Sequence, residues 1–131
     1  MTPLTAVFVL TCALLAQDAA KQPLTGLTTV PESTAYTETS RYDDVVAFMR
    51  PVGAASPVVR VTTFRYTNEG RALPLAIVGD VADSTPEAVK ASGKLRVYIQ
   101  GNIHGGEVGG KESAQQLLGA SFRWWLLNDL V

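Results

Sequence analysis

The chain has 131 residues, of which 47% are hydrophobic and 18% are charged, and these proportions are ordinary for one globular domain or part of one. Its formal net charge of −1 at pH 7 provides no electrostatic basis for binding nucleic acid or an anionic membrane surface, so we expect neither partner. The composition therefore indicates a folded protein whose partners are not polyanions.

An apolar run from Leu4 to Leu15 lies at the start of the chain. It is too short to span a bilayer comfortably, and the small Ala16 followed by the polar Gln17 is typical of a signal-peptide cleavage site. A buried first helix or strand is the alternative, because no basic residue precedes the apolar run. We predict a signal peptide over residues 1–16 and a secreted or periplasmic protein, not bound to the membrane after cleavage. Cleavage would remove the only cysteine, so the mature chain would contain no disulfide.

Residues 17–39 are rich in Thr, Pro, Ser and small residues without periodicity, which predicts an extended lead-in. A helix is predicted next, capped by Ser40, with Asp43 at the capping-box position, and ended by Pro51 and Gly53. Its apolar side chains recur at helical spacing on one face: Tyr42, Val45, Val46 and Met49. We place the folded domain at residues 40–131.

Three strands are predicted after this helix. Residues 58–66 alternate and are β-branched, and residues 73–78 follow a turn at Asn68-Glu69-Gly70, so this pair predicts a hairpin. Residues 94–100 are mostly apolar, which indicates a third strand in the interior of a sheet.

Two further helices are predicted, a short one from the N-cap Thr85 to about Ala91 and a longer one from near Gly109 to a break at Gly119. One face of the longer helix is expected to pack on the sheet: Ala114, Leu117 and Leu118. Its other side chains are expected to face water: Lys111, Glu112, Gln115 and Gln116. The aromatic and aliphatic cluster after it favours core packing over a ligand platform: Phe122, Trp124, Trp125, Leu126, Leu127 and Leu130.

The candidate chemistry lies between the third strand and the longer helix, in Gln100-Gly101-Asn102-Ile103-His104-Gly105-Gly106-Glu107-Val108-Gly109-Gly110-Lys111-Glu112. This glycine-rich turn carries a histidine and a glutamate three residues apart. Imidazole and carboxylate are ligand types of zinc, and an open zinc site takes three protein ligands and a water. Ligands of open α/β sheets bind at the carboxyl ends of the strands, where this turn is expected. His104 and Glu107 are therefore the candidate metal ligands.

The turn has two other interpretations. One is a surface turn without function. The other is a phosphate loop, because Gly105 to Lys111 fits G-x-x-x-x-G-K. In a phosphate loop, however, Glu112 would occupy the position of the magnesium-binding hydroxyl, and Glu107 would place a negative charge among the phosphates. The metal interpretation uses both His104 and Glu107.

This motif, together with Tyr42–Phe48 and Thr67–Arg71, resembles the first zinc-binding motif of the carboxypeptidase A family of zinc metallopeptidases, especially its secreted bacterial members. The resemblance implies an α/β fold, a mixed-sheet α/β sandwich of which only about three strands and two to three helices are present. It implies Zn²⁺ as the cofactor, with His104 and Glu107 as two ligands of the His₂Glu set known for that family. Gly106 stands where digestive members carry an arginine, so their substrate contact there is not carried over.

The resemblance further implies a peptide or protein substrate, shortened from its C-terminus by a zinc-activated water. His104 is the only histidine, so we expect the third ligand, the general base and the substrate-binding arginine beyond Val131. No catalytic residue is then expected within this chain. The sequence predicts the N-terminal part of a zinc carboxypeptidase domain, an incomplete and inactive fragment.

Two alternatives remain open at this point. One is a zinc amidohydrolase of acylated amino acids, similar to aspartoacylase or succinylglutamate desuccinylase, whose motif also runs His-Gly-x-Glu. The export signal and the upstream likeness favour the peptidase. The other is a non-catalytic fragment that binds a partner through its aromatic C-terminus.

Overall fold

The computed structural model describes the backbone of residues 26–128 and the side chains of residues 26–120. The predicted signal peptide and the aromatic side chains from Phe122 onward lie outside the described residues. The elements are α1 (Val30–Ser33), α2 (Tyr42–Ala55), β1 (Val59–Tyr66), β2 (Ala72–Val78), α3 (Pro86–Ala91) and α4 (Val108–Asn128). This small mixed arrangement confirms the predicted α/β class of a partial fold. None of the helices between residues 26 and 128 is long and apolar enough to cross a membrane.

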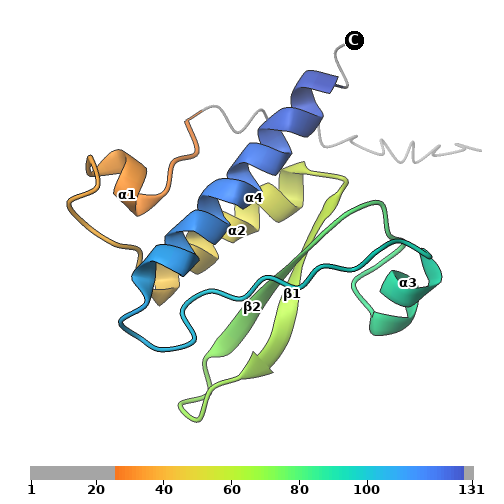
Figure 1. The fold of residues 1–131 in the computed structure, drawn as a ribbon, viewed down its shortest axis with the longest axis horizontal. Coiled ribbons are helices and arrows are strands. Elements are labelled where there is room, and N and C mark those ends of the chain that lie inside the picture. Colours follow the sequence, from red (N-terminus) through yellow and green to blue (C-terminus); the bar gives the residue numbers. More distant parts are fainter. Residues whose placement is uncertain (1–25, 129–131) are drawn as a thin grey trace, which may run out of the picture.

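Figure 1 shows α2 and α4 side by side and running in the same direction, with the β1–β2 hairpin next to α2 and α3 at the far end from the start of α4. The N-termini of α2 and α4 therefore lie together. This arrangement places the residues just before α2 next to the turn that precedes α4.

The predicted lead-in is not extended throughout, because it contains α1. Thr29 caps this helix: its hydroxyl accepts a hydrogen bond from the Glu32 backbone N–H, and the Glu32 carboxylate accepts one from the Thr29 N–H at 2.8 Å. This reciprocal capping and a proline in the first turn stabilise a single helical turn without any apolar periodicity. The prediction of an extended segment from 17 to 39 was wrong here for that reason.

Helix α2 is one turn longer than predicted and has a different cap. Arg41 is the N-cap residue, and the Asp44 carboxylate, not that of Asp43, accepts a hydrogen bond from the Arg41 N–H at 2.7 Å. The helix also continues through Pro51, which costs about 3 kcal/mol in a helix interior. Burial of Val52 and Ala55 beyond the proline offsets this cost, since a fully buried aliphatic side chain contributes about 1.5–3 kcal/mol.

The predicted hairpin is confirmed. β1 and β2 pair antiparallel, from Val59 opposite Val78 to Tyr66 opposite Ala72. The register shifts between Thr63 and Arg65, directly across from Pro74, which has no N–H to donate to the ladder.

The predicted third strand is absent from the described structure. Residues 94–100 run as coil, and Leu95 is 92% exposed. The backbone of residues 95–101 makes no backbone–backbone hydrogen bond to another described residue. An apolar run suits an interior strand only where neighbouring strands and covering layers exist. Within residues 26–128, β1 and β2 pair only with each other. The interior placement was therefore wrong for the described part of the chain.

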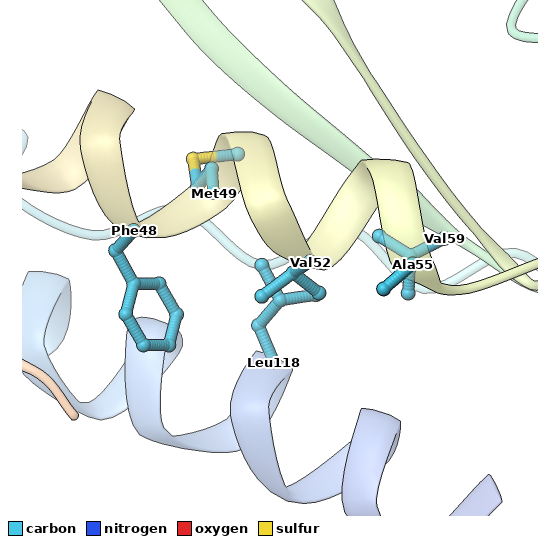
Figure 2. Packing of buried hydrophobic residues seen from close by; sticks show 6 residues of the cluster. All are labelled: Phe48, Met49, Val52, Ala55, Val59 and Leu118. Carbon is cyan, nitrogen blue, oxygen red and sulfur yellow. The ribbon is translucent and has the colours of Figure 1, made fainter. Parts of the chain in front are cut away.

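The core joins α2, β1 and α4, as Figure 2 shows. Its buried apolar residues are Phe48, Met49, Val52, Ala55, Val59 and Leu118. Gly119 does not end α4: it lies within the helix, where an added Cβ would be 3.3 Å from the Phe48 ring. The glycine therefore lets α2 and α4 approach closely, which is a tertiary reason for a residue that locally disfavours helix.

Candidate metal site

The candidate ligands lie on a turn formed by residues 101–107, called here the ligand turn. Gly101 begins it in direct contact with the first turn of α4, since an added Cβ would lie 2.7 Å from the Gly110 carbonyl carbon and from the Lys111 nitrogen. Asn102 follows with a φ of +59°, in the left-handed region that asparagine tolerates better than most residues. Only glycine fits at position 101. The left-handed conformation of Asn102 then turns the chain toward α4.

The structure brings His104 and Glu107 together, as the sequence predicts. The His104 Nδ1 lies 2.7 Å from the Glu107 Oε1, and the Glu107 N–H donates to the His104 carbonyl oxygen at 2.9 Å. The Glu107 Oε2 also accepts a hydrogen bond from the His104 N–H at 3.3 Å. Their side chains are 80% and 56% exposed, so both donor groups are accessible from solvent.

These two donors fit part of a zinc site. Two ligands of one tetrahedral ion, each about 2.0–2.1 Å from it, lie about 3.3 Å apart, so the observed pair at 2.7 Å needs only a small separation to share an ion. A Cβ added at Gly105 or Gly106 would meet no atom within 4 Å, which leaves open space beside the donors. Within the part of the chain that the structure describes, no third His, Cys, Asp or Glu joins them.

An open groove of about 300 Å³ lies between α2 and the hairpin. Its lining is mainly apolar, and neither His104 nor Glu107 contributes to it. The candidate chemistry is therefore on the exposed ligand turn and not in this groove.

A second group of polar residues surrounds Glu112. The prediction that Glu112 faces water was wrong, because its side chain is only 12% exposed. This Glu112 cluster consists of Thr39, Ser40, Lys111, Glu112 and Gln115. The Glu112 carboxylate accepts hydrogen bonds from the Thr39 hydroxyl, from the Ser40 N–H at 2.7 Å and from the Ser40 hydroxyl at 2.7 Å. The Gln115 amide donates to it at 3.0 Å, and the Lys111 ammonium lies 3.0 Å away.

The buried face of α4 is correspondingly rotated from the predicted one. Gln115 is only 3% exposed, whereas Leu117, which was expected to pack on the sheet, is 53% exposed. The spacing of apolar residues in α4 could not predict this rotation, because the buried polar side chains pack against a distant segment. Ser40 and Glu112 are 72 positions apart in the chain. Only the parallel packing of α2 and α4 brings them together.

Opposing effects act on the Glu112 carboxyl group. Burial raises its pKa, but hydrogen bonds from Thr39, Ser40 and Lys111 favour the ionised form more strongly. The net result is a pKa lowered from 4.5 to about 2. Glu112 is therefore a carboxylate across the neutral and mildly acidic range.

Comparison with known proteins bears on the same residues. A family model described as zinc carboxypeptidase matches residues 45–122, a range that includes most of α2, the hairpin, the ligand turn and the first part of α4. No curated protein and no solved structure matches the chain significantly.

Proposed function

Since the chain belongs to the zinc carboxypeptidase family, we propose that it is the N-terminal part of a catalytic domain that removes C-terminal residues from peptides. The observation that carries this proposal is the contact between His104 and Glu107, which lies within the matched residues on an exposed turn. The family model, described as a carboxypeptidase, also favours the peptidase over an amidohydrolase of acylated amino acids.

His104 and Glu107 would hold the zinc ion as two of its ligands. When bound, the ion would supply a water of lowered pKa and polarise the scissile carbonyl group. The chain's own contribution is to hold an imidazole and a carboxylate on one side of a short turn. The hydrogen bond from the His104 N–H to Glu107 limits the rotation of the carboxylate, and the open space at Gly105 and Gly106 leaves room for a peptide.

The remaining groups of the reaction are proposed to lie outside this chain. The described residues add no third metal-binding side chain to His104 and Glu107. A general base and an arginine for the peptide carboxylate are likewise expected beyond Val131. We therefore propose that the 131-residue chain binds zinc weakly and does not turn over peptides.

Zinc titration of the purified chain tests the ligand assignment. His104→Ala and Glu107→Ala should each weaken zinc binding at least about 10-fold, because each removes one of two donors. Glu87→Ala is the control, since it removes an exposed carboxylate on α3, far from the ligand turn in Figure 1. Equal zinc affinity of the parent chain and the His104→Ala variant would contradict the assignment.

Hydrolysis assays test the fragment and the substrate class. Neither a peptide with a free C-terminus nor an N-acyl amino acid should be hydrolysed by the zinc-loaded chain. Robust release of C-terminal residues would show that the chain is a complete enzyme. Hydrolysis of the N-acyl amino acid would instead favour the amidohydrolase.

Export is part of the proposal and is supported by the apolar run before Ala16. N-terminal sequencing of the protein recovered after expression in a secreting host should begin at Gln17. A product that retains Met1 would contradict cleavage.

A further inference from the structure

We infer that Glu112 is a positioning residue for the zinc ligands: by fastening the start of α4 to Thr39 and Ser40, it fixes the ligand turn in place. The inference depends on the proposed function, because it assigns a role in holding His104 and Glu107. In the described structure no hydrogen bond or ion pair joins Glu112 to either of these side chains, so its effect must pass through the backbone.

The ligand turn takes its support from the first turn of α4. Glu107 directly precedes Val108, the first residue of that helix. At the other end of the ligand turn, Gly101 contacts Gly110 and Lys111 backbone atoms. Both ends of the turn therefore rest on the same helical turn. A displacement of that helical turn would move both ends of the ligand turn.

The ligands have little other support. Their side chains are mostly exposed, and within the described chain His104 and Glu107 form hydrogen bonds only with each other. Packing therefore does not hold the imidazole in one orientation. The position of the first turn of α4 decides where the two donors lie.

The Glu112 cluster supplies the attachment that holds this helical turn. The Ser40 N–H and hydroxyl donate to different oxygens of the Glu112 carboxylate, while the Lys111 ammonium donates to the Ser40 carbonyl oxygen and to the Thr39 hydroxyl. Buried Gln115 donates to both Ser40 and Glu112. Each of the two segments, Thr39–Ser40 and the first turn of α4, thus donates hydrogen bonds to the other.

The charge of Glu112 suits this position. The N-termini of α2 and α4 lie together, and each carries a partial positive charge from its unpaired N–H groups. A carboxylate beside the N-terminus of α2 offsets that charge. Because Glu112 is only 12% exposed, its hydrogen bonds are little weakened by competing water.

The test compares zinc affinity of the parent chain with that of Glu112→Gln, which keeps the side-chain shape but removes the charge and one acceptor. We expect zinc binding to weaken about 10-fold, as for other groups that orient metal ligands without touching the metal. Glu87→Gln makes the same chemical change on exposed α3 and should leave zinc affinity unchanged. The amide NMR chemical shifts of residues 102–107 in the absence of zinc provide a second readout. These shifts should change in Glu112→Gln but not in Glu87→Gln.

Ser40→Ala tests the same attachment from the opposite side. It should weaken zinc binding as well. The double variant Ser40→Ala/Glu112→Gln should bind zinc almost as tightly as Glu112→Gln alone, because both substitutions break the same attachment between Ser40 and Glu112. Should Glu112→Gln fail to fold, the milder Ser40→Ala variant decides the question. Parental zinc affinity and unchanged amide shifts in the folded variants would overturn the inference. Failure of the parent chain to bind zinc would instead overturn the proposed function.

Discussion

Single residues determine the shape of the ligand turn. Asn102 accepts a left-handed backbone conformation immediately after Gly101, and the side chains of His104 and Glu107, three positions apart, then come into contact. The sequence motif made the His–Glu contact predictable, because a tight turn brings side chains at this spacing together. The role of Glu112 was not predictable in this way, since its donors Thr39 and Ser40 come from a distant part of the chain.

The lowered pKa of Glu112 predicts a pH dependence of stability. A carboxyl group whose pKa falls from 4.5 to about 2 on folding stabilises the folded state fully above its unfolded pKa. This contribution is lost as the pH falls from about 5 to about 2. Glu112→Gln should therefore differ most from the parent at neutral pH, and the difference in unfolding free energy should shrink on acidification.

Urea denaturation of both proteins across this pH range measures that difference. Glu87→Gln, the same change on α3, serves as the control for the loss of one exposed carboxylate. The contrary result is a difference in unfolding free energy between the parent and Glu112→Gln that stays constant down to about pH 2. That result would show that folding does not stabilise the Glu112 carboxylate.

At the scale of elements, close backbone contacts set how the pieces fit together. Gly101 lies against α4, Gly119 admits the Phe48 ring, and a Cβ at Gly53 of α2 would lie 2.7 Å from the Val61 side chain of β1. Gly53 and Gly119 were predicted as helix ends, because glycine locally disfavours a helix. In the fold, both glycines instead allow close packing between different elements: Gly53 between α2 and β1, and Gly119 between α4 and α2.

Gly101 and Gly110 form a matched pair for testing the contact between the ligand turn and α4. Gly101→Ala should lower the free energy of unfolding by about 1–3 kcal/mol, because its Cβ would meet backbone atoms that cannot rotate away. At Gly110 the added Cβ would lie 3.4 Å from the Gly101 Cα, an ordinary contact. Gly110→Ala should therefore be neutral or stabilising by up to about 1 kcal/mol, as alanine favours helix.

Chemical denaturation of the two variants at neutral pH provides the comparison. If Gly101→Ala is as stable as Gly110→Ala, the ligand turn does not contact α4 in solution as it does in the structure.

At the scale of the whole molecule, an apolar strip is exposed along residues 94–100, the segment predicted as an interior strand. Its members are Leu95, Val97, Tyr98 and Ile99, which are between 64% and 92% exposed. An extended apolar segment with free backbone groups is a site at which chains pair with one another. The described structure covers neither its side chains nor the backbone groups of residues 95–101 with a paired strand.

We accordingly expect concentration-dependent self-association of the purified chain. Val97→Lys combined with Ile99→Lys should reduce it, because two charges would interrupt the apolar strip. Phe64→Lys is a suitable control, as it removes an exposed apolar side chain on β1, outside the strip. Light scattering at increasing concentration measures the effect. Equal association of the parent and the double variant would rule out the strip as the contact.

The sequence by itself determined what depends on near neighbours: the hairpin, the cap of α3 and the spacing of His104 and Glu107. Only the tertiary structure decided that Glu112 and Gln115 are enclosed while residues 94–100 are exposed. Burial depends on which distant segment lies alongside, and Ser40 reaches Glu112 only because α2 and α4 pack in parallel. Local patterns carry no information about such a neighbour.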